Sequence, residues 1–366
     1  MCLLFVAMFL FAQASNAATY PLNLTPGRSW PLSVIADSSR GFVYFDTTSG
    51  EYPPTGFSFG IINVTTHAVT KILPLDVNPG AMALNQRSGD VYVAGSTSIA
   101  VLDARNLSFV RQIAIGRPIL SITYDSSVSQ NLFVTSGNHV FSVNPQTGVI
   151  ERNATFANHV DGIALDPANG RLFVGEYPYG GISVLNASSL APLSTIALPG
   201  CCALQFALDD TTQVIYAATG TNFMYSVNAA TDTFDKSVQV APSAQNSTNS
   251  IVVDNNTGRV YVATSPGGSI IELDSAGNVV GHYEVQSQSQ VAGMAVDTKT
   301  EELYATNYHQ ITVFDAARPR TFFFLIAVTG AVVAVATIGV YLFLRRRDNR
   351  ERMQIQLGKQ TEGGVQ

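Results

Sequence analysis

The chain has 366 residues, of which 46% are apolar and only 13% are charged. This composition excludes an intrinsically disordered protein, which is rich in charge and poor in apolar residues. The net charge of −6 argues against a nucleic-acid partner, because a protein that binds nucleic acid needs a basic surface. Three cysteines are too few for a disulfide scaffold or a cysteine zinc cluster.

The chain begins with a short apolar run, residues 2–14, which is followed by the small residues Ser15, Asn16, Ala17 and Ala18. The run is shorter than the roughly 20 residues that a helix needs to span a bilayer. Small residues after such a run are typical of a signal-peptide cleavage site, although no basic residue precedes it here. We therefore predict a secretory signal peptide over residues 1–17.

One pattern then occurs seven times between residues 18 and 317. Each copy has an apolar strand that ends in Asp or Asn, a turn, and a second strand that contains an aromatic residue. The residues that end the first strands are Asp37, Asn85, Asp125, Asp166, Asp209, Asp254 and Asp297. The aromatic residues are Tyr44, Tyr92, Phe133, Phe173, Tyr216, Tyr261 and Tyr304, spaced 48, 41, 40, 43, 45 and 43 residues apart.

Four short strands in a repeat of this length are typical of a β-propeller blade. The sequence therefore predicts an all-β fold, a seven-bladed β-propeller with four-stranded blades, over residues 18–317. The seventh repeat ends after its third strand, at residues 311–315. We expect residues 19–24 to supply the missing fourth strand of blade 7, which would leave no open sheet edge.

Several second strands share a sequence motif. The examples are Val91-Tyr92-Val93-Ala94, Phe133-Val134-Thr135, Val260-Tyr261-Val262-Ala263-Thr264 and Tyr304-Ala305-Thr306-Asn307. Over residues 19–315 the chain thus resembles the YVTN-type β-propeller repeat family. The resemblance implies a propeller scaffold of a secreted or surface-attached protein, and it implies no particular activity.

The residues that end the first strands have two interpretations. Seven oxygen-bearing side chains could be metal ligands, but Asp and Asn also cap tight turns by accepting bonds from nearby backbone N–H groups. We expect turn caps. We likewise expect the seven aromatic residues to lie in the sheet core and not in a binding row.

In a propeller, the connections from second to third strand and from fourth strand to the next blade share one face, here called the top face. Loops carry most recognition, and exposed aromatic residues beside carboxylates suit a protein or carbohydrate contact. Blade 1 has an insertion over residues 47–56, and blade 4 has one over residues 176–181. The predicted partner-binding residues are Trp30, Glu51, Tyr52, His139, His159, Asp161, Glu176, Tyr177, Tyr179, Tyr308 and His309.

The sequence predicts no catalytic residue, no metal site and no cofactor. The central channel should be lined by the innermost strands, and the inward positions there contain no carboxylate, with Asp161 the lone acid at the top. A hard cation needs six or more oxygen ligands. No nucleophile elbow, phosphate loop or dinucleotide fingerprint occurs. The alternative is a propeller enzyme of the lactonase or quinoprotein-dehydrogenase type, which a bound metal or cofactor would favour.

Two covalent features suggest a location outside the cell. Cys201 and Cys202 are adjacent in a top-face loop, where they could form a vicinal disulfide, pair between molecules, or remain free thiols. Seven Asn-x-Ser/Thr sequences are candidate glycosylation sites. They begin at Asn23, Asn63, Asn106, Asn153, Asn186, Asn246 and Asn255.

The C-terminal part resembles a membrane anchor. Residues 322–344 contain no charge, and Arg345, Arg346 and Arg347 follow directly. This length suits one transmembrane helix, and the basic tail, residues 345–366, marks the cytoplasmic side. We therefore expect a single-pass protein of the cell membrane with its propeller outside. Its predicted function is non-catalytic binding of a surface protein or an envelope carbohydrate.

Overall fold

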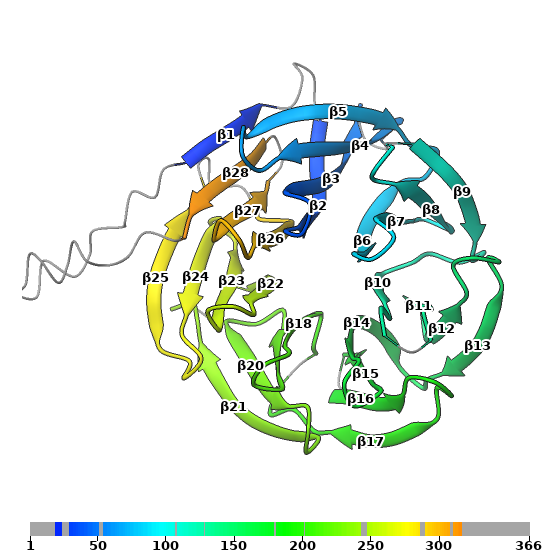
Figure 1. Ribbon diagram of the computed structural model, residues 1–366. Helices are drawn as coiled ribbons and strands as arrows, with labels where there is room; N and C mark the ends of the chain where they lie inside the picture. Colours follow the sequence, from blue (N-terminus) through cyan, green and yellow to red (C-terminus); the bar gives the residue numbers. More distant parts are fainter. Residues whose placement is uncertain are drawn as a thin grey trace, which may run out of the picture. The chain divides into compact units, whose positions relative to one another are not determined.

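The computed structural model describes residues 19–23, 29–50, 54–106, 108–127, 129–178, 181–200, 202–242, 247–285, 290–307 and 310–316. These residues form seven four-stranded antiparallel sheets arranged in a ring (Figure 1). The predicted seven-bladed propeller is therefore confirmed. The predicted signal peptide (1–17), membrane helix (322–344) and tail (345–366) lie outside the described residues. Among the described residues there is no helix of the length and hydrophobicity that a membrane span requires.

The blades follow one another along the chain. Blade 1 contains β2 (Ser29–Asp37), β3 (Phe42–Ser49), β4 (Gly56–Asn63) and β5 (Ala68–Pro74). Blade 2 contains β6 (Pro79–Asn85), β7 (Asp90–Gly95), β8 (Ser98–Asp103) and β9 (Ser108–Ala114). Blade 3 contains β10 (Ser121–Tyr124), β11 (Leu132–Ser136), β12 (His139–Val143) and β13 (Ile150–Thr155). Blade 4 contains β14 (His159–Asp166), β15 (Arg171–Tyr177), β16 (Gly181–Asn186) and β17 (Pro192–Ile196).

The last three blades complete the ring. Blade 5 contains β18 (Gln205–Asp209), β19 (Val214–Ala218), β20 (Phe223–Asn228) and β21 (Thr233–Gln239). Blade 6 contains β22 (Ser247–Asp254), β23 (Arg259–Ser265), β24 (Ser269–Leu273) and β25 (Val279–Glu284). Blade 7 contains β26 (Gly293–Asp297), β27 (Glu302–Thr306), β28 (Gln310–Asp315) and, from the N-terminal part, β1 (Thr19–Asn23).

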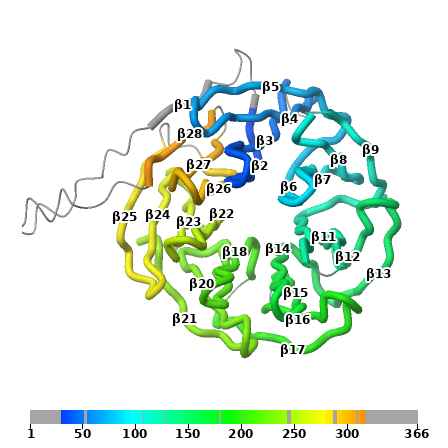
Figure 2. Tube along the Cα trace, viewed as in Figure 1, coloured from blue at the N-terminus to red at the C-terminus, as the bar shows by residue number. Residues whose placement is uncertain are grey.

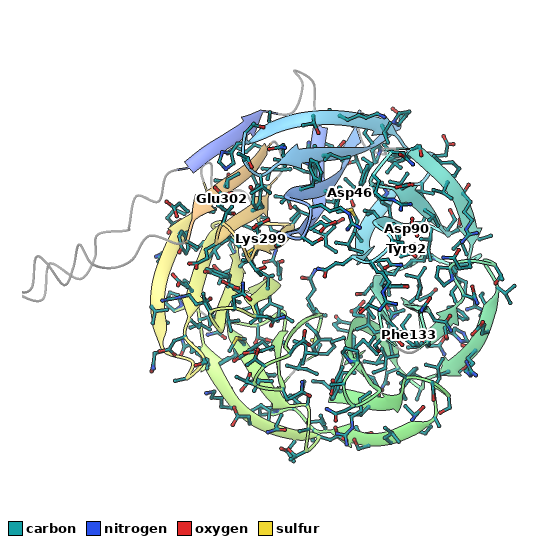
Figure 3. All side chains as sticks on the ribbon, viewed as in Figure 1. Asp46, Asp90, Tyr92, Phe133, Lys299 and Glu302 are labelled. Carbon is teal, nitrogen blue, oxygen red and sulfur yellow. The ribbon has the colours of Figure 1, made fainter. Side chains whose placement is uncertain are left out.

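The N-terminal strand closes the ring as predicted. β1 pairs with β28 in antiparallel register from Thr19 opposite Phe314 to Asn23 opposite Gln310, and Figure 1 shows the two strands side by side. The tube in Figure 2 follows the chain from blade to blade around the ring. Blades 7 and 1 are also linked by polar contacts. Lys299 Nζ donates to the Ser39 carbonyl at 3.1 Å, and His67 Nε2 lies 2.8 Å from Glu302 Oε1 (Figure 3).

The Asp and Asn residues that end the first strands cap turns, as predicted. All seven are buried. Asp297 Oδ1, for example, accepts hydrogen bonds from the backbone N–H groups of Lys299 and Thr300, both at 2.9 Å. Asp166 Oδ1 accepts the equivalent bond from the Ala168 N–H at 3.0 Å. The side chains therefore satisfy turn N–H groups that would otherwise lack partners.

The seven repeated aromatic residues lie in the core, as predicted, and none is more than 2% exposed. They pack in the interfaces between blades. At the interface of blades 1 and 2, Tyr44 and Phe59 pack in one cluster with Val91 and Val93. Repeating this contact around the ring removes large apolar side chains from water at each interface, which stabilises the closed ring.

Two strands are longer than the sequence indicates. Trp30, predicted as a partner-binding residue of the top face, is part of β2, and it pairs with Thr48 of β3. The blade 1 connection is thus shortened to residues 50–55. The register shift between Pro31 and Val34 explains the difference, because a β-bulge absorbs extra residues and lets pairing resume beyond it.

Candidate functional site

Six of the eleven predicted partner-binding residues belong to the described part of the chain. They are Trp30, His139, His159, Asp161, Glu176 and Tyr177. The other five lie outside the described residues. They are Glu51, Tyr52, Tyr179, Tyr308 and His309.

The structure brings four of these residues together at the top edge of blade 4. His159 is directly opposite Tyr177 in the β14–β15 ladder, and Val160 is opposite Glu176. His159 Nε2 lies 3.4 Å from Asp161 Oδ1. We call His159, Asp161 and Tyr177 the blade 4 cluster. Its two aromatic residues are partly open to solvent, since the His159 side chain is 45% exposed and Tyr177 as a residue is also 45% exposed.

A β-bulge gives the blade 4 cluster its shape. The register of β14 shifts between Val160 and Ile163, which takes Asp161 and Gly162 out of the regular ladder. Asp161 keeps 26% of its side chain exposed. The blade 4 cluster therefore combines a carboxylate acceptor, an imidazole and a phenol ring on one edge, a combination that can bind hydroxyl or amide groups and stack on a flat apolar surface.

Glu176 belongs to the same edge but has a different environment. It is only 9% exposed. Its Oε2 accepts a hydrogen bond from Asn158 Nδ2 at 3.0 Å, and its Oε1 accepts one from Ser183 Oγ at 2.5 Å. Both carboxylate oxygens are therefore occupied within the protein. Glu176 therefore ties the residue before β14 to β16, next to the blade 4 cluster.

The connection from blade 4 to blade 5 packs against this edge. A Cβ at Gly175 would lie 2.0 Å from the Ala203 carbonyl oxygen, and one at Gly162 would lie 2.9 Å from that of Leu204. Such distances are too short for any side chain, so both positions require glycine. The backbone around residues 203–204 therefore forms a wall beside Asp161 and Glu176.

The cysteine of this connection that the structure describes is buried and disulfide-bonded. Cys202 is 3% exposed, and its sulfur participates in a disulfide. Cys201 lies outside the described residues, so the vicinal pairing with Cys202 stays a prediction.

Trp30 and His139 lie on other blades. Trp30 is half-buried at the upper end of β2 in blade 1. His139, at the start of β12 in blade 3, stacks on Phe141 with ring centroids 5.5 Å apart. Its Nδ1 lies 3.1 Å from Asn153 Oδ1 and 3.2 Å from Thr155 Oγ1. His139 thus contacts a predicted glycosylation sequence and not the blade 4 cluster.

The predicted glycosylation sites differ in environment, and all of them stay predictions. Asn106 and Asn153 are exposed, whereas Asn63, Asn186 and Asn255 are half-buried. Asn186 Oδ1 caps its turn by accepting the Ser188 N–H at 3.1 Å. Asn23 lies in β1, and Asn246 lies outside the described residues.

The described residues contain no group of three or more His, Cys, Asp or Glu side chains that could hold a metal ion. The blade 4 cluster contributes only one carboxylate and one imidazole. These side chains can form hydrogen bonds and ring contacts.

Sequence reasoning missed three residues that matter for the top face. Asn158 and Ser183 hold Glu176 from two different strands, and no single-sequence signal links them. Asp46, a buried acid in blade 1, did leave a signal. It stands two residues after the repeated aromatic, where the other six repeats have Ala94, Thr135, Gly175, Ala218, Ala263 and Thr306.

The comparisons with known proteins support the fold. No family model matches the sequence, and no curated protein is similar to it in sequence. The structure is similar to the crystal structure of the β-propeller domain of Cps50 (Swd1) from Myceliophteria thermophila, with a TM-score of 0.65 and 10% sequence identity. The similarity covers 81% of this chain and 99% of that one. At this identity it shows a shared β-propeller fold and nothing of function.

Proposed function

We propose that the protein is a non-catalytic binding scaffold that contacts its partner through the blade 4 cluster. The proposal rests on the contrast between the exposed residues of the blade 4 cluster and the buried, bonded Glu176 on the same edge. The His159 side chain and the residue Tyr177 are each 45% exposed, while Glu176, next to Tyr177 on the same strand, is buried and has both carboxylate oxygens bonded. Rigid, exposed aromatic side chains supply much of the binding energy at protein interfaces at a low entropy cost.

The chemistry of the blade 4 cluster favours a partner with a flat apolar face and several hydrogen-bonding groups. A carbohydrate of the cell envelope and a loop of another surface protein both have these features. Asp161 accepts hydrogen bonds from hydroxyl or N–H groups, and the rings of Tyr177 and His159 contact C–H surfaces. The part of the edge beside residues 203–204 is closed by backbone, so the partner approaches from the solvent side.

We also propose that the chain is a single-pass membrane protein of the YVTN-type repeat family, with its propeller outside the cell. The uncharged segment 322–344 and the arginines after it support this topology. The repeated second-strand motifs support the family. An epitope tag after residue 366 should become accessible to antibody only when the cells are permeabilised, whereas labelling of intact cells would contradict the topology.

A photocrosslinking experiment tests the binding surface. A photoreactive phenylalanine analogue placed at Tyr177 should, on illuminated intact cells, join the protein to one recurring adduct. Mass spectrometry of that adduct distinguishes a glycan from a polypeptide. Replacing Asp161 by Asn should reduce the yield several-fold, because the charged acceptor beside Tyr177 is lost.

The matched control places the same analogue at Phe109, which is 56% exposed on the outer strand of blade 2. This position should give no recurring adduct. Equal adduct patterns from positions 177 and 109 would contradict a binding surface on blade 4.

A further inference from the structure

Blade 1 contains a carboxylate that is cut off from solvent. Asp46, near the upper end of β3, is 0% exposed (Figure 3). It faces the bulge of β2, where its Oδ1 accepts the Ser33 backbone N–H at 3.0 Å and its Oδ2 accepts the Ser33 hydroxyl. A buried carboxylate is normally paired with a cation, and no ion pair involving Asp46 occurs among the described residues.

Two other blades place a threonine at the same position of the repeat. Thr135 of blade 3 and Thr306 of blade 7 also stand two residues after the repeated aromatic. Each hydroxyl accepts a backbone N–H from its own inner strand, from Ser121 at 3.0 Å and from Gly293 at 2.8 Å. These bonds are equivalent to the one between Ser33 and Asp46.

The two threonines also link their blade to the next one. Thr135 Oγ1 donates to the Asp161 carbonyl of blade 4 at 2.8 Å, and Thr306 Oγ1 lies at donor distance, 3.0 Å, from the Leu32 carbonyl of blade 1. The carbonyls of their own inner strands are farther away, at 3.5 Å and 3.2 Å. Asp161 and Leu32, whose carbonyls accept these bonds, each stand five residues before the Asp that ends the inner strand. The equivalent residue of blade 2, the blade that follows Asp46, is Gly80, five residues before Asn85.

Threonine and aspartate differ at this position in whether the side-chain oxygen carries a proton. A hydroxyl accepts one hydrogen bond and donates another, whereas an ionised carboxylate can only accept. A protonated carboxyl group does both. Protonated Asp46 can therefore do what Thr135 and Thr306 do, namely hold its own bulge and donate toward the next blade.

We propose that Asp46 is a proton-binding site that joins the top edges of blades 1 and 2 when it is protonated and loosens them when it is ionised. This site goes beyond the proposed binding function and does not depend on it. The upper end of blade 1 carries Trp30 and the connection over residues 50–55, so the proton controls the packing of a part of the top face.

No other charge faces Asp46 from the strands around it. β4 and β6 contain no charged residue, and the acids of β2 and β7, Asp37 and Asp90, stand at the opposite ends of those strands. Asp76, in the connection between β5 and β6, is exposed. Within the described strands, the immediate surroundings of Asp46 are therefore neutral.

The titration of Asp46 agrees with this geometry. Burial raises the pKa of Asp46 to about 6, and the hydrogen bonds from Ser33 and Leu32 oppose the rise without cancelling it. An unfolded Asp has a pKa of about 3.9. Because the folded value is the higher one, the stability that the proton contributes is complete below about pH 4 and is lost as the pH rises through about 6.

The test compares the unfolding temperature of the full-length protein with that of the Asp46→Thr variant from about pH 4 to about pH 8. Threonine retains the donor and the acceptor, so the variant should lack the Asp46 contribution to pH dependence. Relative to the variant, the unmodified protein should lose on the order of 5 °C across this range, with most of the loss between about pH 4 and about pH 6 and little change above it. A difference between the two proteins that is constant with pH would overturn the proposal.

A second measurement keeps the proposal testable if Asp46→Thr does not fold. The carboxyl carbon of Asp46 is followed by NMR in protein labelled at aspartate, and its signal is assigned by comparison with Asp46→Asn. A titration midpoint near 6 supports the site, and one near 4 overturns it. The exposed Asp76→Asn variant is the control, and an equal loss of pH dependence in that variant would also overturn the proposal.

Discussion

Asp161 and Glu176 are acids on neighbouring strands of blade 4, but their surroundings give them opposite roles. Asp161 stands in a bulge and keeps 26% of its side chain exposed, so its carboxylate is available to a partner. Glu176 is 9% exposed, and both of its oxygens accept bonds from Asn158 and Ser183. At the scale of a residue, exposure and bonding separate a carboxylate that is open to solvent from one that is bonded within the protein.

Removing the Glu176 carboxylate should destabilise the protein. In Glu176→Ala the partners Asn158 and Ser183 lose their acceptor, and we expect the free energy of unfolding to fall by about 1–3 kcal/mol. Glu176→Gln keeps one acceptor oxygen and should cost less. Denaturant unfolding of both variants measures the effect. Equal stability of Glu176→Ala and the unmodified protein would show that the bonds from Asn158 and Ser183 to Glu176 do not stabilise the fold.

At the scale of an element, bulges and glycines shape the top edge. The bulges of β2 and β14 turn Ser33 and Asp161 out of the ladder. Gly162 and Gly175 then let the connection at residues 203–204 approach the backbone of blade 4. The position of the blade 4 cluster is thus set mainly by residues within the strands β14 and β15.

Adding one methyl group at Gly175 tests this close approach. The Cβ of Gly175→Ala would lie 2.0 Å from the Ala203 carbonyl oxygen, so the backbone must move, and we expect a loss of about 2 kcal/mol or more in unfolding free energy. Gly80→Ala is the matched control, because a Cβ there meets nothing within 4 Å. Chemical denaturation of the two variants should separate them clearly. Equal effects would contradict the packing described here.

Sequence could predict those features that recur in every repeat. Turn caps such as Asp297, core aromatics such as Tyr304, and the strand that closes blade 7 follow from a pattern seen seven times. The burial of Glu176 could not be predicted, because Asn158 and Ser183 meet it from elements whose spacing shows no pattern. The β-bulge that lets Trp30 join β2 left no signal in the repeat either.

At the scale of the whole molecule, the propeller differs from blade to blade while its core stays regular. The interfaces between blades use the same apolar positions, and the first and last strands close the ring through β1 and β28. Individual blades then carry an acid at a repeated position where the other blades have neutral residues, as with Asp46 in blade 1 and Asp161 in blade 4. Recognition and proton binding can therefore be added to single blades without changing the scaffold.

Hydroxyl-radical footprinting on intact cells tests the proposed binding surface most directly. Oxidation of Tyr177 and His159 should be at least about threefold slower on cells than in the purified protein, since a bound partner covers exposed aromatic side chains. Phe109, on the outer strand of blade 2, should be oxidised equally in both. Protection of Phe109, with Tyr177 and His159 oxidised as fast on cells as in the purified protein, would contradict partner binding at blade 4.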